Sequence, residues 1–339
     1  MANDYPDSIL TRWYIDTRPL TTSTNSLPLL STLREPDQTA VQKFYHLKDR
    51  HMSLASNLLK YFFIHRTARV PWSEIVISRT PDPHRRPFYI HPKTRIEGGG
   101  GEVVEVEPIN IEFNVSHQAS MAALAGTIIP PASATEQVQA EAKAKAKPEV
   151  GIDITCVNER VGRNNEARTL DSLREYIDIF AEVFSAKEIA AMKALHGVPC
   201  SISSQDVVDY GYRLFFTYWA LKEAYIKMTG EALLAPWLRE LEFGNVVAPA
   251  KESGEGVFGE PYKGVKTTLR GDVMDDVRVE VVALEDDYLF ATAARGGRIG
   301  NGSGGEDEGD GQDPWGPFQK LDIERDIRPC ATGTCNCLS

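Results

Sequence analysis

The alternation of hydrophobic and polar positions is clearest at residues 149–155. Aliphatic side chains alternate there with small or polar ones, which predicts a β-strand with one apolar face and one face that carries Gly151, Asp153 and Thr155. The glycine allows another segment or a ligand to approach the backbone closely. An edge strand with one wet face is the ordinary explanation of such a pattern, and for Asp153 alone it would suffice.

A helical period follows at residues 213–229. Apolar side chains recur there at helical spacing, so Glu223 and Lys227 are predicted to lie one turn apart on one face of a helix. A carboxylate can bind a divalent cation or accept a proton, and a lysine beside it can bind a phosphate. Taken alone, a Glu–Lys pair at this spacing is usually a solvated surface pair.

The rest of the pattern predicts strands packed on a long helix in each half of the chain. Residues 37–65 carry apolar side chains at helical spacing and predict one long helix. Further strands are predicted at residues 13–16, 74–77, 109–115, 121–129, 266–270, 277–283 and 288–293. The expected organisation is an N-terminal α/β half at 1–129, a low-complexity linker at 130–148, a C-terminal α/β half at 149–295, a disordered glycine-rich and acidic stretch at 296–312, and an apolar C-terminal segment at 313–339 that docks on the body.

Composition narrows the class of protein. The 339 residues are 42% hydrophobic and 25% charged, as in soluble proteins with a sizeable core. A formal charge of −11 argues against general nucleic-acid binding. No run is apolar enough to span a bilayer and no signal-peptide pattern is present, so we expect a cytoplasmic protein. Cys330, Cys335 and Cys337 cluster without a histidine nearby in sequence, which favours reduced thiols over a metal or redox site.

Together, the strand and the helix resemble the signature of a known enzyme family. Residues 150–153 read VGID and residues 219–227 read WALKEAYIK, and this pair is similar to the paired motifs of the phosphopantetheinyl transferases. Residues 113–117, FNVSH, resemble the upstream motif of the Sfp-type branch. Further similarity to the broad-range enzymes of filamentous fungi lies at residues 79–87, 225–243 and 321–339.

The resemblance implies both a fold and a reaction. The fold is α+β, with two similar α/β halves related by a pseudo-twofold axis in a monomer. The reaction moves the 4'-phosphopantetheine of coenzyme A to a serine of an acyl or peptidyl carrier protein and releases 3',5'-ADP. The expected carriers belong to polyketide synthases, nonribosomal peptide synthetases and the aminoadipate reductase of lysine biosynthesis. Leu233, Leu234 and Trp237 are either apolar contacts for the carrier or ordinary core. The alternatives are a non-catalytic carrier-binding scaffold and a metal-dependent coenzyme A hydrolase.

The resemblance also assigns roles to the motif residues. Asp153 and Glu223 are the expected Mg²⁺ ligands, because Mg²⁺ prefers oxygen ligands. Many bacterial relatives have a third carboxylate where this chain has Thr155, which leaves the third ligand open. Glu223 is also the expected base, directly or through a water, and Lys227 is expected to bind a phosphate. Lys222 is expected to reach the pantetheine side.

Basic residues of the first half are expected to bind coenzyme A. Ser116 and His117 lie at the end of a predicted strand, and His117 resembles the family histidine that contacts the 3'-phosphate. Without the resemblance, a hydrogen-bonded structural histidine would be the better explanation. The other expected contacts with the phosphates or the adenine are Lys48, Arg79, Arg85 and Arg86.

Overall fold

The computed structural model describes residues 10–81, 86–91, 94–97, 103–106, 109–129, 147–159, 168–200, 202–231, 235–300 and 313–338. Two compact units emerge, and each is described by itself. Unit 1 comprises Met1–Pro148 and Gly309–Ser339, and unit 2 comprises Glu149–Glu308. Among the sequence-derived candidates, Arg85, Leu233 and Leu234 lie outside the described residues.

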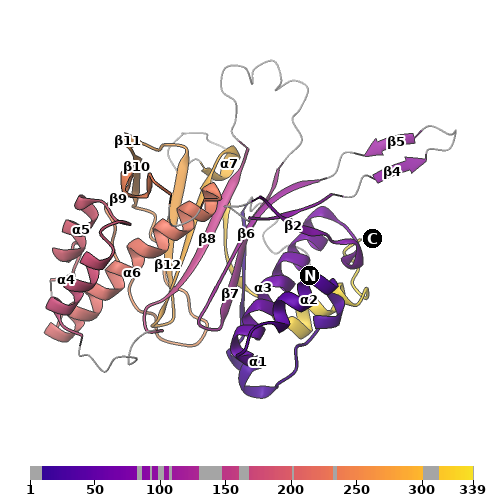
Figure 1. The fold of residues 1–339 in the computed structure, drawn as a ribbon, viewed down its shortest axis with the longest axis horizontal. Helices are drawn as coiled ribbons and strands as arrows, with labels where there is room; N and C mark the ends of the chain where they lie inside the picture. Colours follow the sequence, from indigo (N-terminus) through magenta and orange to yellow (C-terminus); the bar gives the residue numbers. More distant parts are fainter. Residues whose placement is uncertain are drawn as a thin grey trace, which may run out of the picture. The chain divides into compact units, whose positions relative to one another are not determined.

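Unit 1 is built on a four-stranded sheet with the strand order β14-β1-β7-β6 (Figure 1). Strand β1 pairs antiparallel with β7 and parallel with β14, so a strand from the end of the chain completes the sheet beside its first strand. The helices of unit 1 are α1 (Arg18–Ser23), α2 (Glu35–Gln42), α3 (Leu47–Ala68) and α8 (Arg328–Ala331), with short 3₁₀ turns at Leu30–Thr32 and Trp72–Glu74 and a π-helical turn at Ile323–Ile327. Its strands are β1 (Leu10–Asp16), β2 (Ile77–Arg79), β3 (Pro87–Tyr89), β4 (Thr94–Glu97), β5 (Val103–Val106), β6 (Asn110–Gln118), β7 (Met121–Ile129) and β14 (Trp315–Lys320).

Helix α3 forms the centre of unit 1. Its residues from His51 to His65 are all buried, so it is packed on every side rather than on one stripe. The prediction of one helix over residues 37–65 was wrong, because α2 ends at Gln42 and α3 begins only at Leu47. The side chain of Arg50 stabilises this break, since its Nε donates a hydrogen bond of 2.7 Å to the carbonyl oxygen of Phe44.

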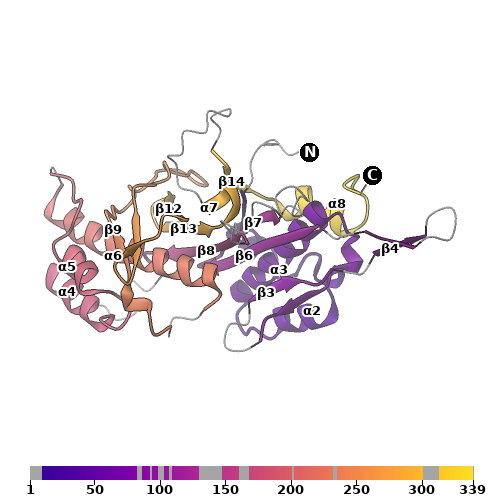
Figure 2. The ribbon, with the colours of Figure 1, turned by 90° about the horizontal axis from the view of Figure 1, so that it is seen from above.

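Two further parts of unit 1 bear on the later sections. The strand expected at residues 74–77 begins later, at Ile77, because Trp72–Glu74 form a 3₁₀ turn. The C-terminal segment runs from β14 through the π-helical turn to α8, and Ile323, Ile327 and Cys330 are buried in the same core as α3. Figure 2 shows this segment in yellow beside α3.

Unit 2 repeats the plan of a long helix on an antiparallel sheet. Its main sheet has the order β12-β13-β8, and α6 lies across β8 and β13 (Figure 1). A second sheet of three short strands has the order β11-β10-β9. The helices are α4 (Leu170–Ile179), α5 (Ala186–Lys193), α6 (Ser204–Thr229) and α7 (Gly297–Gly300), with a 3₁₀ turn at Leu238–Glu240. The strands are β8 (Glu149–Cys156), β9 (Leu241–Gly244), β10 (Lys266–Leu269), β11 (Asp272–Val273), β12 (Val277–Leu284) and β13 (Tyr288–Arg295).

The two units thus give the α+β class with two halves of similar plan that the sequence predicts. Among the helices that the structure describes, none combines the length and the apolar character needed to cross a membrane.

Candidate active site

Helix α6 carries three of the candidate residues, Lys222, Glu223 and Lys227, and the residues at its two ends show where it begins and ends. The side chain of Ser203 accepts a hydrogen bond from the backbone N–H of Asp206, which caps the start of the helix. Gly230 ends it in the left-handed region with a φ of 78°. The helix therefore begins nine residues before the start predicted from the apolar period, at Ser204 rather than at Arg213.

Gly151 sets the distance between α6 and β8. A Cβ atom at this position would lie 2.0 Å from the carbonyl oxygen of Ala224 and 2.4 Å from the backbone nitrogen of Met228. Only glycine leaves room for the helix backbone there. The close approach places the helical turn that holds Glu223 and Lys227 directly over the strand that holds Asp153.

Asp153 lies under the helix and accepts hydrogen bonds from two side chains. Its Oδ1 accepts a hydrogen bond from Nζ of Lys227 at 2.6 Å, and its Oδ2 accepts one from Oγ1 of Thr155 at 2.7 Å. The aspartate is only 5% exposed, and every residue of β8 after Glu149 is buried. The interpretation of this strand face as wet is therefore wrong, because α6 covers it. Thr155 orients the aspartate, a role that the sequence did not reveal.

Glu223 lies on the same helix, four residues before Lys227, and is half-buried. Burial, and then the negative charge of Asp153, raise the pKa of Glu223 from its usual 4.5 to about 7, although the charge of Lys227 opposes this shift. Near neutral pH the carboxyl group is thus partly protonated, and it can lose its proton when a cation binds or exchange it with a substrate. Asp153, Glu223 and Lys227 are the sequence-derived candidates that the structure brings together.

The donor atoms of this cluster suit a small, hard cation. Two carboxylates close enough for mutual repulsion leave negative charge that one lysine offsets only in part. Oxygen ligands of this kind are those that Mg²⁺ prefers, usually one or two carboxylates with phosphate oxygens completing the shell. Asp153 and Glu223 are the residues that would hold it.

Lys222 does not belong to this cluster. Its side chain is fully buried, its Nζ lies 3.0 Å from Oε2 of Glu188, and it donates hydrogen bonds to the carbonyl oxygens of Leu238 and Leu241. Glu188 also accepts a hydrogen bond from the backbone nitrogen of Phe243 at 2.9 Å. A contact between Lys222 and pantetheine stays a prediction, but the ammonium group already holds these three partners inside the core.

The coenzyme A candidates lie in unit 1 and differ in exposure. Ser116 and His117 are neighbours near the end of β6, with Ser116 buried and His117 exposed. The guanidinium group of Arg86 forms a short ion pair with Glu112, which lies on β6. Lys48, at the start of α3, and Arg79, at the end of β2, are both exposed. The predicted contacts of these residues with coenzyme A therefore stay predictions.

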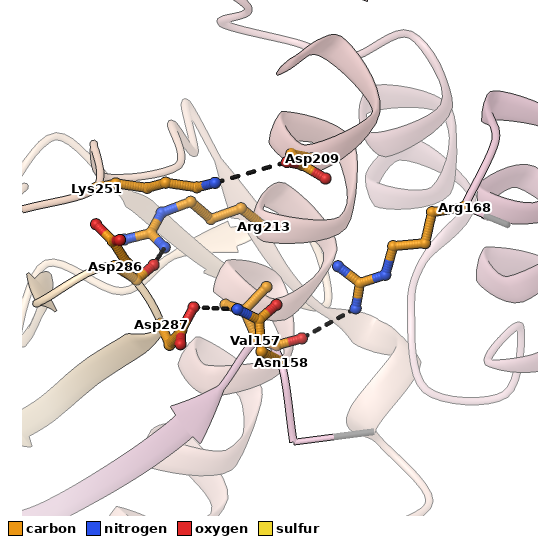
Figure 3. A pocket seen from close by; sticks show the side chains of 8 residues that line it. All are labelled: Val157, Asn158, Arg168, Asp209, Arg213, Lys251, Asp286 and Asp287. Atoms are coloured by element: carbon orange, nitrogen blue, oxygen red, sulfur yellow. Dashed lines mark hydrogen bonds and ion pairs between the residues drawn. The ribbon is translucent and has the colours of Figure 1, made fainter. Parts of the chain in front are cut away.

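A polar cavity lies elsewhere in unit 2 (Figure 3). Arg213 fills one side of it and donates hydrogen bonds to the carbonyl oxygens of Pro249, Ala250 and Asp286 at 2.5, 3.1 and 2.7 Å. Arg213 precedes Glu223 by ten helical residues, about 15 Å along the axis. The cavity is therefore separate from the carboxylate cluster. Its Arg213 links α6 to the loops that contain Pro249, Ala250 and Asp286 through the hydrogen bonds above. The lining residues are Val157, Asn158, Arg168, Asp209, Arg213, Lys251, Asp286 and Asp287.

Comparisons with known proteins show which family the chain is similar to. Residues 21–129 match the family described as "4'-phosphopantetheinyl transferase, N-terminal", and residues 149–282 match the "4'-phosphopantetheinyl transferase superfamily". The chain is 67% identical to "4'-phosphopantetheinyl transferase NpgA" of Emericella nidulans, with 98% of this chain and 96% of that protein covered. It is 55% identical to "4'-phosphopantetheinyl transferase A" of Aspergillus fumigatus, with 97% and 96% covered.

A more distant relative extends the comparison beyond fungi. The chain is 23% identical to the "L-aminoadipate-semialdehyde dehydrogenase-phosphopantetheinyl transferase" of Mus musculus, with 78% of this chain and 68% of that protein covered. The motifs at residues 113–117, 150–153 and 219–227 all fall inside the matched regions.

Proposed function

Because the chain belongs to the 4'-phosphopantetheinyl transferase superfamily, we propose that Asp153, Glu223 and Lys227 carry out its phosphopantetheinyl transfer. The observation that carries the proposal is the contact between Lys227 and Asp153, beside a glutamate whose pKa is raised to about 7. The carboxylates of Asp153 and Glu223 supply a cation site, Glu223 also supplies a base, and the ammonium group of Lys227 supplies a phosphate contact.

The reaction balances with these groups. The serine oxygen of the carrier protein attacks the β-phosphorus of coenzyme A, and a new oxygen–phosphorus bond forms. The bond between that phosphorus and the bridging oxygen breaks, so 3',5'-ADP leaves with the electron pair and the 4'-phosphopantetheine stays on the serine. When bound, Mg²⁺ neutralises charge on the pyrophosphate.

Glu223 is the proposed base and accepts the serine proton directly or through a water. Without a bound cation, burial beside Asp153 raises the pKa of Glu223 to about 7, near the pH at which a general base works best. A cation bound to this carboxylate would lower its pKa, so the proton would then pass through a coordinated water. Asp153 has a different part, because the hydrogen bond from Thr155 and the ammonium group of Lys227 hold it as an oriented carboxylate. Both carboxyl groups are thus proposed as metal ligands, and Glu223 is the one that also serves as the base.

Lys227 supplies positive charge to the reacting phosphates. Its Nζ is bound to Asp153, and its side chain remains 27% exposed, so the ammonium group can reach an anion without leaving the helix surface. A charge at this place stabilises the negative charge that spreads over the phosphoryl oxygens in the transition state. His117, Ser116 and the basic residues of unit 1 are proposed to bind the 3'-phosphate, the pyrophosphate and the adenine.

The proposed acceptors are acyl and peptidyl carrier proteins of polyketide synthases, nonribosomal peptide synthetases and aminoadipate reductase. The name of the mouse relative, which refers to L-aminoadipate-semialdehyde dehydrogenase, supports the last of these. Trp237, half-buried against Tyr225 with ring centroids 5.9 Å apart, offers part of an apolar surface just after α6. We further propose that the chain acts as a cytoplasmic monomer with Mg²⁺.

The test is an intact-mass measurement on purified apo carrier proteins after incubation with coenzyme A, Mg²⁺ and the enzyme. The expected result is a gain of one phosphopantetheine mass on the carrier serine and an equal amount of 3',5'-ADP. Release of 3',5'-ADP without a change in carrier mass would indicate a hydrolase. Carrier binding with neither product would indicate a scaffold. A carrier whose serine is replaced by alanine is the control.

A further inference from the structure

Four potential metal ligands from distant parts of the chain meet in unit 1. His65 near the end of α3 lies beside Cys330 of α8 and the following Cys335 and Cys337, and their ligand atoms all lie within 4.8 Å of one another. Nε2 of His65 is 3.2 Å from Sγ of Cys335, and Sγ of Cys330 is 3.6 Å from Sγ of Cys337. Spacing along the sequence could not reveal this cluster, because the histidine comes from 270 residues earlier in the chain.

The surroundings prepare His65 to act as a ligand. Its Nδ1 lies 2.7 Å from the carbonyl oxygen of Val70, which can only accept, so Nδ1 carries the proton and Nε2 presents its lone pair to the cysteines. A backbone carbonyl that fixes the ring in this way is the usual second contact of a metal-bound histidine.

We propose that His65, Cys330, Cys335 and Cys337 bind one structural Zn²⁺ ion. Three thiolates and one imidazole form a closed Cys₃His set, which is a common structural zinc site. With Zn–S bonds of about 2.3 Å and Zn–N bonds of about 2.0 Å, a tetrahedron has sulfur–sulfur edges of about 3.8 Å and sulfur–nitrogen edges of about 3.5 Å. The separations of 3.6 Å and 3.2 Å lie close to these edges.

Charge and protons balance at the site. Binding converts three thiols into thiolates, so three protons are released to solvent and the assembled centre carries one negative charge. Arg69, one residue after α3, is bound here: its Nη1 donates a hydrogen bond of 3.0 Å to the carbonyl oxygen of Cys337. This guanidinium group supplies a nearby positive charge.

The site would fasten the end of the chain. The C-terminal segment is held at its start by the pairing of β14 with β1 and at its middle by the burial of Ile323 and Ile327. In the last turn, Cys335 and Cys337 are half-buried; Sγ of Cys335 contacts His65 of α3, and the carbonyl oxygen of Cys337 contacts Arg69, just after that helix. A zinc ion would join this turn to the core helix, and its role is independent of the Mg²⁺ proposed for phosphopantetheinyl transfer.

The full chain, expressed in zinc-supplemented medium and purified with reductant and without chelator, should contain one equivalent of zinc by elemental analysis. Titration of the metal-free, reduced protein with Co²⁺ should give the intense visible absorption of a tetrahedral site and thiolate charge-transfer bands, and Zn²⁺ should abolish both. Removal of zinc should lower the melting temperature. Cys335→Ser and His65→Gln should each reduce bound zinc at least tenfold, whereas the control substitutions Cys200→Ser and His46→Gln should leave it unchanged.

Three results would overturn the proposal. The first is wild-type protein that holds less than a tenth of an equivalent of zinc and gives no tetrahedral Co²⁺ spectrum. The second is a different metal at full occupancy on the same ligands. The third is a disulfide between Cys330 and Cys337 that persists in reductant and blocks metal uptake. The Co²⁺ titration uses wild-type protein, so it decides the matter even if a variant fails to fold, and none of these measurements depends on transfer activity.

Discussion

Replacing Gly151 by alanine should separate α6 from β8 and disturb the candidate active site. The added Cβ would lie 2.0 Å from the carbonyl oxygen of Ala224, whereas ordinary contact begins at 3.4 Å, so the gap must open by 1.4 Å. The obstructing atoms belong to the helix backbone and cannot rotate away. Overpacking of this kind costs about 1–3 kcal/mol of folding free energy.

The displacement should also reach the chemistry. Glu223 and Lys227 move with the helix while Asp153 stays with the strand, so the three groups lose their alignment. A misplacement of about 1 Å costs about 100-fold in rate, which corresponds to about 2.7 kcal/mol of transition-state stabilisation. We therefore expect kcat to fall at least about 100-fold at saturating Mg²⁺ and coenzyme A, beyond any loss of folded protein.

The assay combines denaturant unfolding with single-turnover transfer to one carrier protein. Gly244→Ala is the matched control, because its Cβ would lie 3.8 Å from the nearest atom, Cβ of Lys266, in an exposed strand end. The control should change the free energy of unfolding by less than about 0.5 kcal/mol and leave kcat unchanged. If Gly151→Ala matched the control in both measurements, the close approach would not position the active-site residues.

Three other outcomes follow from the same contacts. Asp153→Asn should abolish most transfer and, because Lys227 and Thr155 lose a charged partner, lower the free energy of unfolding by about 1.5–3 kcal/mol in urea titrations. Apparent Mg²⁺ affinity, measured by calorimetry across pH, should weaken as the pH falls below about 7, because the cation must then displace the proton on Glu223; affinity independent of pH would contradict this. Glu188→Gln should lower the free energy of unfolding of unit 2 by about 3–5 kcal/mol, because the ammonium group of Lys222 stays buried without its carboxylate partner. The control Lys187→Met removes the exposed ion pair with Glu242 and should lower the free energy of unfolding by at most about 1 kcal/mol.

The local period of the chain predicted the elements of the active site. Strand β8 and helix α6 follow from alternation and helical spacing within single segments, and the resemblance carried by residues 150–153 and 219–227 is confirmed by the family comparisons. The periodicity did not show that α6 covers Gly151 and Asp153, because burial of a polar strand face depends on tertiary packing. The sequence shows Gly151 two residues before Asp153, but it does not show that the backbone of α6 approaches this glycine.

Partners that are distant in sequence could not be found from spacing. Lys222 and Glu223 are adjacent, yet one points into the core and the other toward the site, because successive helical residues lie about 100° apart. The partner of Lys222 is Glu188, whose S-x-x-E capping box with Ser185 is visible in the sequence and marks a helix start, but not a buried ion pair. The break between α2 and α3 was missed because the apolar pattern continues through Phe44 and Tyr45, although Tyr45 is 88% exposed.

The central claim is that Glu223 serves phosphopantetheinyl transfer from its place beside Asp153 and Lys227. The most direct measurement is the single-turnover rate of carrier modification, followed by intact mass, for the wild type, Glu223→Gln and the exposed control Glu175→Gln at saturating coenzyme A and Mg²⁺. We expect Glu223→Gln to lower this rate by at least about 100-fold, while Glu175→Gln keeps the wild-type rate. A folded Glu223→Gln protein that modifies the carrier at the wild-type rate would show that Glu223 does not serve the transfer.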